Sequence, residues 1–125
     1  MNGKIISISN SKGGVGKTTS CVNLASALAR QGYKVLCCDM DIQGNLGAAL
    51  GLKPDTISAT IANLMLSVIE DNSSEVESLT ESCIIHHNGL DIIPSNLKLS
   101  AVEISLISAM SRETVLKKIL TPLRL

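Results

Sequence analysis

Lys12-Gly13-Gly14-Val15-Gly16-Lys17-Thr18-Thr19 lies between a β-branched stretch and a segment of helical periodicity. Glycine has no side chain, so this stretch can curl until consecutive backbone N–H groups point at the oxygens of a phosphate. The helix that follows presents the positive end of its dipole to the same anion. The sequence therefore predicts a phosphate-binding loop between a strand and a helix.

The side chains of this loop suit a nucleotide triphosphate and its metal ion. Lys17 can reach the β- and γ-phosphates, and the Thr18 hydroxyl can ligate Mg²⁺. The Thr19 hydroxyl stands where it can hold the α-phosphate. The alternative is a glycine-rich turn with incidental lysines, which its place between a strand and a helix disfavours. We therefore expect ATP and Mg²⁺ as cofactors, bound by Lys12, Gly13, Gly14, Val15, Gly16, Lys17, Thr18 and Thr19.

The segments around the loop predict a βαβ unit. Lys4–Ser9 is β-branched and indicates a buried strand. Apolar residues at helical spacing predict a helix over Thr18–Gln31, with Gly32 as its stop. Tyr33–Asp39 is a short apolar run suited to a strand buried on both faces. The predicted fold class is α/β and P-loop NTPase-like, with a mostly parallel sheet and flanking helices.

The rest of the chain predicts further helices and one hairpin. Asn88-Gly89, between Ile84–His87 and Leu90–Ile93, is a strong signal for a two-residue hairpin. Gly44–Leu50 indicates a glycine-punctuated turn that leads into small apolar residues. The predicted helical segments are Thr56–Ile69, Leu97–Ile107 capped by Ser95, and Arg112–Leu120 ending before Pro122. Ser73–Thr80 is a weaker helix or a loop.

Composition limits the function classes. The 125 residues fit one domain, and 11 basic residues balance 11 acidic ones, so no whole-chain field attracts nucleic acid or an anionic membrane. One tyrosine and no Phe or Trp argue against base stacking as a means of recognition. No signal peptide or membrane span is evident, and reducing cytoplasm is the expected compartment.

Other residues that often carry chemistry have structural interpretations. None of the cysteines has the C-x-x-C spacing of a zinc or redox site, and adjacent cysteines in an apolar run behave as small buried hydrophobes. The two histidines lack a third ligand at metal spacing and are expected at the surface. The residues concerned are Cys21, Cys37, Cys38 and Cys83, His86 and His87, and Met65 and Met110 as core fillers.

The phosphate loop departs from the usual pattern in a specific way. Ser11 stands where the first glycine of that pattern would be, and Lys12 adds a second lysine at the mouth of the loop. This deviant Walker A loop resembles that of the ParA/MinD class of ATPases. In that class the early lysine reaches across a dimer interface to the phosphates held by the other subunit. The resemblance implies a homodimer across ATP, with Lys12 as a catalytic residue.

A second motif follows the predicted second strand. Asp39 and Asp41 stand at its carboxyl end, where ligands bind in open parallel sheets. The residues alone leave open a polar strand cap or a Walker B strand. The segment from Asp39 to Asn45 resembles the Asp-x-Asp-Pro-Gln-Gly-Asn of partition ATPases, with Ile42 in place of proline. The resemblance implies that Asp41 is catalytic and orients the attacking water, and that Asp39 supports the magnesium shell or the loop. A turn-forming aspartate is the alternative for Asp41.

The resemblance extends to Ile93-Pro94-Ser95-Asn96 and implies a ParA/Soj-type ATPase of chromosome or plasmid partition. Such a protein is cytoplasmic and nucleoid-associated, binds DNA non-specifically, is stimulated by a ParB-like activator and needs no membrane. Members are about twice as long, so we expect residues 1–125 to be the N-terminal part of a single domain, with a Walker B strand and the DNA contacts after Leu125. Alone, it should bind nucleotide weakly with negligible ATPase activity. The alternatives are a MinD-like membrane-positioning ATPase and a truncated nucleotide-binding module without catalysis.

Overall fold

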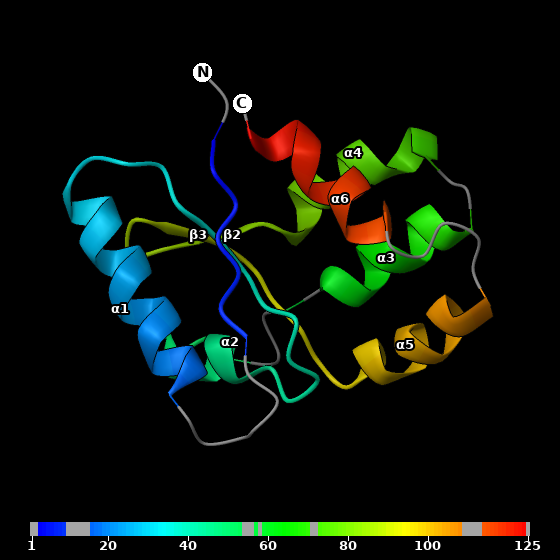
Figure 1. Cartoon of the computed structure of the whole chain (residues 1–125), viewed down its shortest axis with the longest axis horizontal. Helices are drawn as coiled ribbons and strands as arrows, with labels where there is room; N and C mark the ends of the chain where they lie inside the picture. The colour runs from blue at the N-terminus through cyan, green and yellow to red at the C-terminus, as the bar shows by residue number, and fades with distance from the viewer. Residues whose placement is uncertain are drawn as a thin grey trace.

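The computed structural model describes residues 3–9, 16–53, 57, 59–70, 73–108 and 114–124. In Figure 1, α1 and α2 lie on one side of the molecule and α3, α4, α5 and α6 on the other. The elements are α1 (Lys17–Arg30), β1 (Leu36–Cys38), α2 (Asn45–Ala49), α3 (Ile61–Ile69), α4 (Ser73–Cys83), β2 (Ile85–His87), β3 (Leu90–Ile93), α5 (Lys98–Ser108), α6 (Val115–Leu120) and the 3₁₀ helix η3 (Thr121–Arg124).

The described strands form a mixed sheet in the order β1-β3-β2. β1 pairs with β3 in parallel, with Cys37 opposite Ile92, and β2 pairs with β3 antiparallel. The predicted hairpin is confirmed, because Asn88 and Gly89 both adopt the positive φ, 50° and 80°, that a tight two-residue turn requires. The α/β class with flanking helices is confirmed as well.

Two apolar cores cover the two faces of the sheet. Successive strand residues point to opposite faces, so Cys37 and Ile92 pack under α1 and α2. Ile93, the neighbour of Ile92, packs instead with α3, α5 and α6. The second core also holds Met65, as predicted, and Cys83. All four cysteines are free.

The prediction of a buried strand over Lys4–Ser9 is wrong for this structure. Residues 3–9 form no strand with any other described segment, and they are exposed. Ile5 and Ile6, for example, keep 55% and 61% of their surface accessible. β-branched residues favour the extended backbone of a strand. Whether that strand is buried depends on neighbouring strands that pair with it. The predicted βαβ unit is therefore not formed, and β1 takes its parallel partner from β3.

Helix boundaries follow local capping chemistry. α1 ends as predicted at Gly32, where Gly32 N donates to Ala29 O and Tyr33 N donates to Leu28 O. α3 begins later than predicted, because Thr60 and Asn63 form a capping box at its start. The segment from residue 73 is a helix rather than a loop.

The structure also tests the predicted cap of α5 and the predicted surface position of a histidine. Ser95 is not the cap of α5, since Asn96 Oδ1 accepts from Lys98 N at 3.1 Å. His86 is exposed, as predicted. Met110 lies outside the described residues, and so do the first two residues of the predicted helix Arg112–Leu120. No helix in the described part of the chain is both long and apolar enough to cross a membrane.

Candidate nucleotide site at the carboxyl end of the sheet

The start of α1 carries the described part of the predicted phosphate loop. Gly16 adopts φ 84°, ψ 19°, a left-handed conformation that glycine reaches without strain, and Ser20 N donates to Gly16 O at 2.8 Å. No side chain among the described residues caps this helix start, and its first turn carries no acid. Lys17 and Thr18 are half-buried, and Thr19 is exposed. A helix start directs its first N–H groups and the positive end of its dipole outward, which is the arrangement that binds an anion.

The other predicted loop residues cannot be placed. Lys12, Gly13, Gly14 and Val15 lie outside the described residues. Their roles therefore stay predictions.

Asp39 directly follows β1 and is almost fully buried. Its N–H donates to Ile93 O at 3.0 Å, which continues the parallel pairing of β1 and β3 by one residue. Asp39 is 6% exposed, and its Oδ1 accepts from Asp41 N at 2.9 Å. Its other oxygen, Oδ2, is buried without a hydrogen-bond partner among the described atoms. Burial raises the pKa of this carboxyl above its ordinary value, and the backbone N–H groups of Asp41 and Leu46 oppose the rise.

Asp41 organises the turn that follows. Its Oδ1 accepts from Gln43 N at 3.0 Å, and its Oδ2 accepts from the Asn45 side chain at 2.7 Å. Gly44 N donates back to Asp41 O at 2.9 Å, which closes the turn. The turn-forming role considered for Asp41 is therefore present in the structure. The bonds from Gln43 N and the Asn45 side chain fix the half-buried Asp41 carboxylate at the start of α2.

The fold brings these two parts to one edge of the sheet. α1 runs back over the sheet and leads into β1, so α1 begins at the edge where β1 ends. Cys21 and Val22 of α1 pack with Cys37 of β1 and Leu46 of α2 in one apolar core. Figure 1 shows α2 beside the N-terminal end of α1. This edge is where ligands bind in open α/β sheets.

The donor set fits a hydrated magnesium ion. No group of three or more His, Cys, Asp or Glu that could hold a metal occurs within the described ranges. Mg²⁺ needs no such cage, because it keeps several waters and takes one or two carboxylates together with substrate phosphates. The unpartnered Oδ2 of Asp39 is a hard oxygen ligand of this kind. Thr18, at the start of α1, offers a hydroxyl from the neighbouring element.

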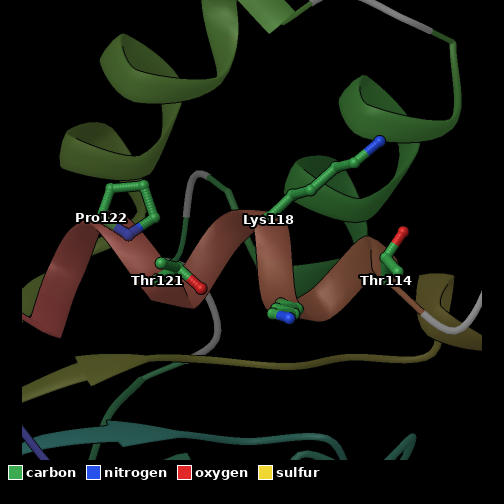
Figure 2. Close-up of a pocket in the computed structure, with 5 residues that line it drawn as sticks. Thr114, Lys118, Thr121 and Pro122 are labelled. Carbon is green, nitrogen blue, oxygen red and sulfur yellow. The ribbon is translucent and has the colours of Figure 1, made fainter.

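A separate hollow of about 540 Å³ lies along α6 and η3. Figure 2 shows its labelled side chains along this stretch. Its lining has two lysines and two threonines but neither a glycine turn nor a carboxylate, so it lacks the backbone cradle and the acidic group of the predicted nucleotide site. The lining residues are Thr114, Lys117, Lys118, Thr121 and Pro122.

The sequence patterns missed one residue at this edge. Ser95, predicted as a helix cap, is buried at the end of β3, and its carbonyl oxygen lies against Gly44. The signal that could have identified it is its place at the carboxyl end of a parallel strand, the same rule that identified Asp39 and Asp41.

Comparisons with known proteins show the family to which this chain is related. A family model described as an AAA domain matches residues 3–125. The chain is 40% identical over 121 residues to the chromosome partitioning protein ParA of Myxococcus xanthus, which covers 97% of this chain and 40% of ParA. It is 38% identical over 118 residues to the sporulation initiation inhibitor protein Soj of Bacillus subtilis, covering 94% of this chain and 44% of Soj. The chain thus spans less than half the length of these relatives.

A solved structure with the same fold contains a nucleotide. The cobyrinic acid a,c-diamide synthase from Mycobacterium smegmatis, with bound ATP analog and magnesium, superposes with a TM-score of 0.79 at 32% identity. The match covers 92% of this chain and 44% of that protein.

Proposed function

Because the chain belongs to the AAA-domain family and, within it, to the ParA/Soj type of partition ATPase, we propose that it forms the phosphate-binding part of an enzyme that hydrolyses ATP in chromosome or plasmid partition. The observation that carries this proposal is the meeting of two features at one sheet edge. One is the uncapped start of α1 after Gly16, and the other is the buried Asp39 with its unpartnered oxygen.

Each described residue of the edge has a task in such a site. The first N–H groups of α1 bind phosphate oxygens, and Lys17 places its ammonium group on the terminal phosphates. Thr18 and Asp39 would hold Mg²⁺, which when bound neutralises charge on the phosphates. Asp41, fixed by Gln43 N and Asn45, would hold the attacking water in line.

The proposal extends to the assembly. Lys12 would reach the phosphates of a second copy, which makes the active form a dimer across ATP. A ParB-like activator would stimulate hydrolysis, and non-specific DNA would bind outside these 125 residues, whose charges balance. The relatives named ParA and Soj support this extension through sequence similarity alone.

The test is nucleotide affinity after removal of one lysine. Lys17→Ala should weaken binding of a fluorescent ATP analogue to the chain at least tenfold, because a charge-assisted contact to phosphate is lost. Lys34→Ala is the matched control: Lys34 is exposed and lies beyond the opposite end of α1. Equal affinities for the two variants would refute the proposed site. We expect the 125-residue chain itself to bind the analogue weakly and to release almost no phosphate from ATP.

A further inference from the structure

Ser95 lies in an unusual position for a serine. It is 5% exposed, and its hydroxyl oxygen is buried without a hydrogen-bond partner among the described atoms. Capping does not explain it, because Asn96 performs that task for α5. Buried hydroxyls are nearly always paired, with protein or with ordered water, so an unpaired one calls for a partner.

The second unpaired buried atom is at the same edge of the sheet. Asp39 Oδ2 and Ser95 Oγ are the buried side-chain oxygens or nitrogens without a partner within the described residues. Asp39 N donates to Ile93 O, so Asp39 lies beside Pro94, the residue directly before Ser95. A hydroxyl can donate and a carboxylate can only accept, so the two orphaned groups are chemically complementary.

A backbone contact ties the two segments together. Gly44, which closes the turn of Asp41, lies so close to Ser95 that a Cβ on Gly44 would be 2.7 Å from Ser95 O. The corner after β3 therefore supports the turn after β1 directly. Asp39 stabilises the same turn, because its Oδ1 accepts a hydrogen bond from Asp41 N.

We propose that Ser95 is a positioning residue of the nucleotide site: its hydroxyl donates to one ordered water that in turn donates to Asp39 Oδ2, and this link orients the carboxylate that Mg²⁺ requires. The result is a chain of hydrogen bonds from Ser95 to Asp39 to the Asp41 backbone. A carboxylate oriented in this way presents its remaining lone pairs in a fixed direction. This inference rests on the proposed function, since a magnesium site gives the orientation its purpose.

The first experiment tests the contact without nucleotide. Hydrogen exchange of the Asp41 amide, followed by NMR, reports whether Asp39 Oδ1 still holds that N–H. Ser95→Ala should speed this exchange severalfold. Ser100→Ala is the control, because Ser100 is exposed on α5 and donates only to its own helix at Leu97 O. Exchange that is the same in both variants and in the wild type would overturn the contact.

The second experiment tests the role. The affinity for a fluorescent ATP analogue is measured for the wild type, Ser95→Ala and Ser100→Ala, once with Mg²⁺ and once with EDTA. Ser95→Ala should weaken binding about fivefold to tenfold with Mg²⁺, as expected for a lost bond to a charged group, and should leave binding in EDTA unchanged. An equal loss in both conditions, or no loss with Mg²⁺, would overturn the positioning role.

The two readouts separate the inference from the function on which it rests. If the wild type binds no analogue while the Asp41 amide responds to Ser95→Ala, the proposed function fails and the role of Ser95 at a magnesium site fails with it, but the Ser95–Asp39 contact stands. If the analogue binds with the expected dependence on Lys17 and neither readout responds to Ser95→Ala, the function stands and the inference about Ser95 is wrong.

Discussion

Gly44 and Ser95 are in direct backbone contact: a Cβ on Gly44 would lie 2.7 Å from the Ser95 carbonyl oxygen, well inside contact distance. Gly44 also has φ 66°, a left-handed conformation. Glycine is thus required at this position for two independent reasons, its backbone angle and the space it leaves. The contact joins the ends of two parallel strands at the edge where the nucleotide site is proposed.

This contact predicts a large effect of Gly44→Ala. The substitution should lower the free energy of unfolding by about 2–4 kcal/mol, the sum of a left-handed alanine and an overpacked contact. Gly51→Ala is the matched control, because Gly51 has φ 79° with nothing within 4 Å of an added Cβ. It should cost only about 1 kcal/mol. Urea denaturation followed by circular dichroism compares the two, and equal losses would show that the Ser95 contact is unimportant.

The elements that sequence predicted well depend on local chemistry. Asn88-Gly89 specifies its hairpin through the backbone angles of two residues, and Gly32 ends α1 through hydrogen bonds within one turn. The position of Asp39 directly after a strand is local information of the same kind, whereas the roles of Asp39 and Asp41 in a nucleotide site stay predictions. Such features need no knowledge of the rest of the fold.

The elements that sequence did not predict depend on partners distant in the chain. Lys4–Ser9 has the composition of a strand, but a strand also needs an unpaired sheet edge beside it. The composition of one segment does not specify where the rest of the chain places that edge. Ser95 and Asn96 are both good helix caps, and it is Asn96 whose side chain accepts from Lys98 N in the structure. The Ser95 contact itself joins two segments that no local pattern connects.

The start of α3 predicts a measurable loss after removal of its cap. Thr60 Oγ1 accepts from Ala62 N at 3.3 Å, and Asn63 Oδ1 accepts from Thr60 N at 3.0 Å. Thr60→Ala should destabilise the chain by about 1–2 kcal/mol, because a helix-end N–H loses its acceptor inside the core. Thr60→Ser keeps the acceptor and should recover most of the loss. Thr121→Ala, at an exposed position, should change the urea midpoint little.

The centre of β3 predicts a strong dependence on one side chain. Ile92 is 0% exposed and lies between β1 and β2, opposite Cys37 and Ile85. Ile92→Ala should cost about 2–5 kcal/mol, because the sheet cannot collapse around the cavity. Ile104→Ala removes the same atoms from α5, where Ile104 is 71% exposed, and should stay within about 0.5 kcal/mol of the wild type. A similar loss in both variants, measured by urea denaturation, would contradict the assigned core.

The buried thiols predict a loss of stability at alkaline pH. Burial raises the pKa of Cys83 from its ordinary 9.0 to about 11. In the unfolded chain the thiol loses its proton near pH 9, whereas the folded chain keeps it, so the unfolded state binds fewer protons between these values. The stabilising effect is therefore fully present below pH 9 and is lost as the pH rises towards about 11. Burial also raises the pKa of Cys37 and Cys38 to about 12, so the loss of stability continues above pH 11.

The variant Cys83→Ala tests this prediction. It should be less stable than the wild type at pH 8, but its stability should decline less steeply between pH 9 and pH 11, as measured by urea denaturation under reducing conditions. Parallel curves for the variant and the wild type would mean that Cys83 ionises as easily in the folded state as in the unfolded one.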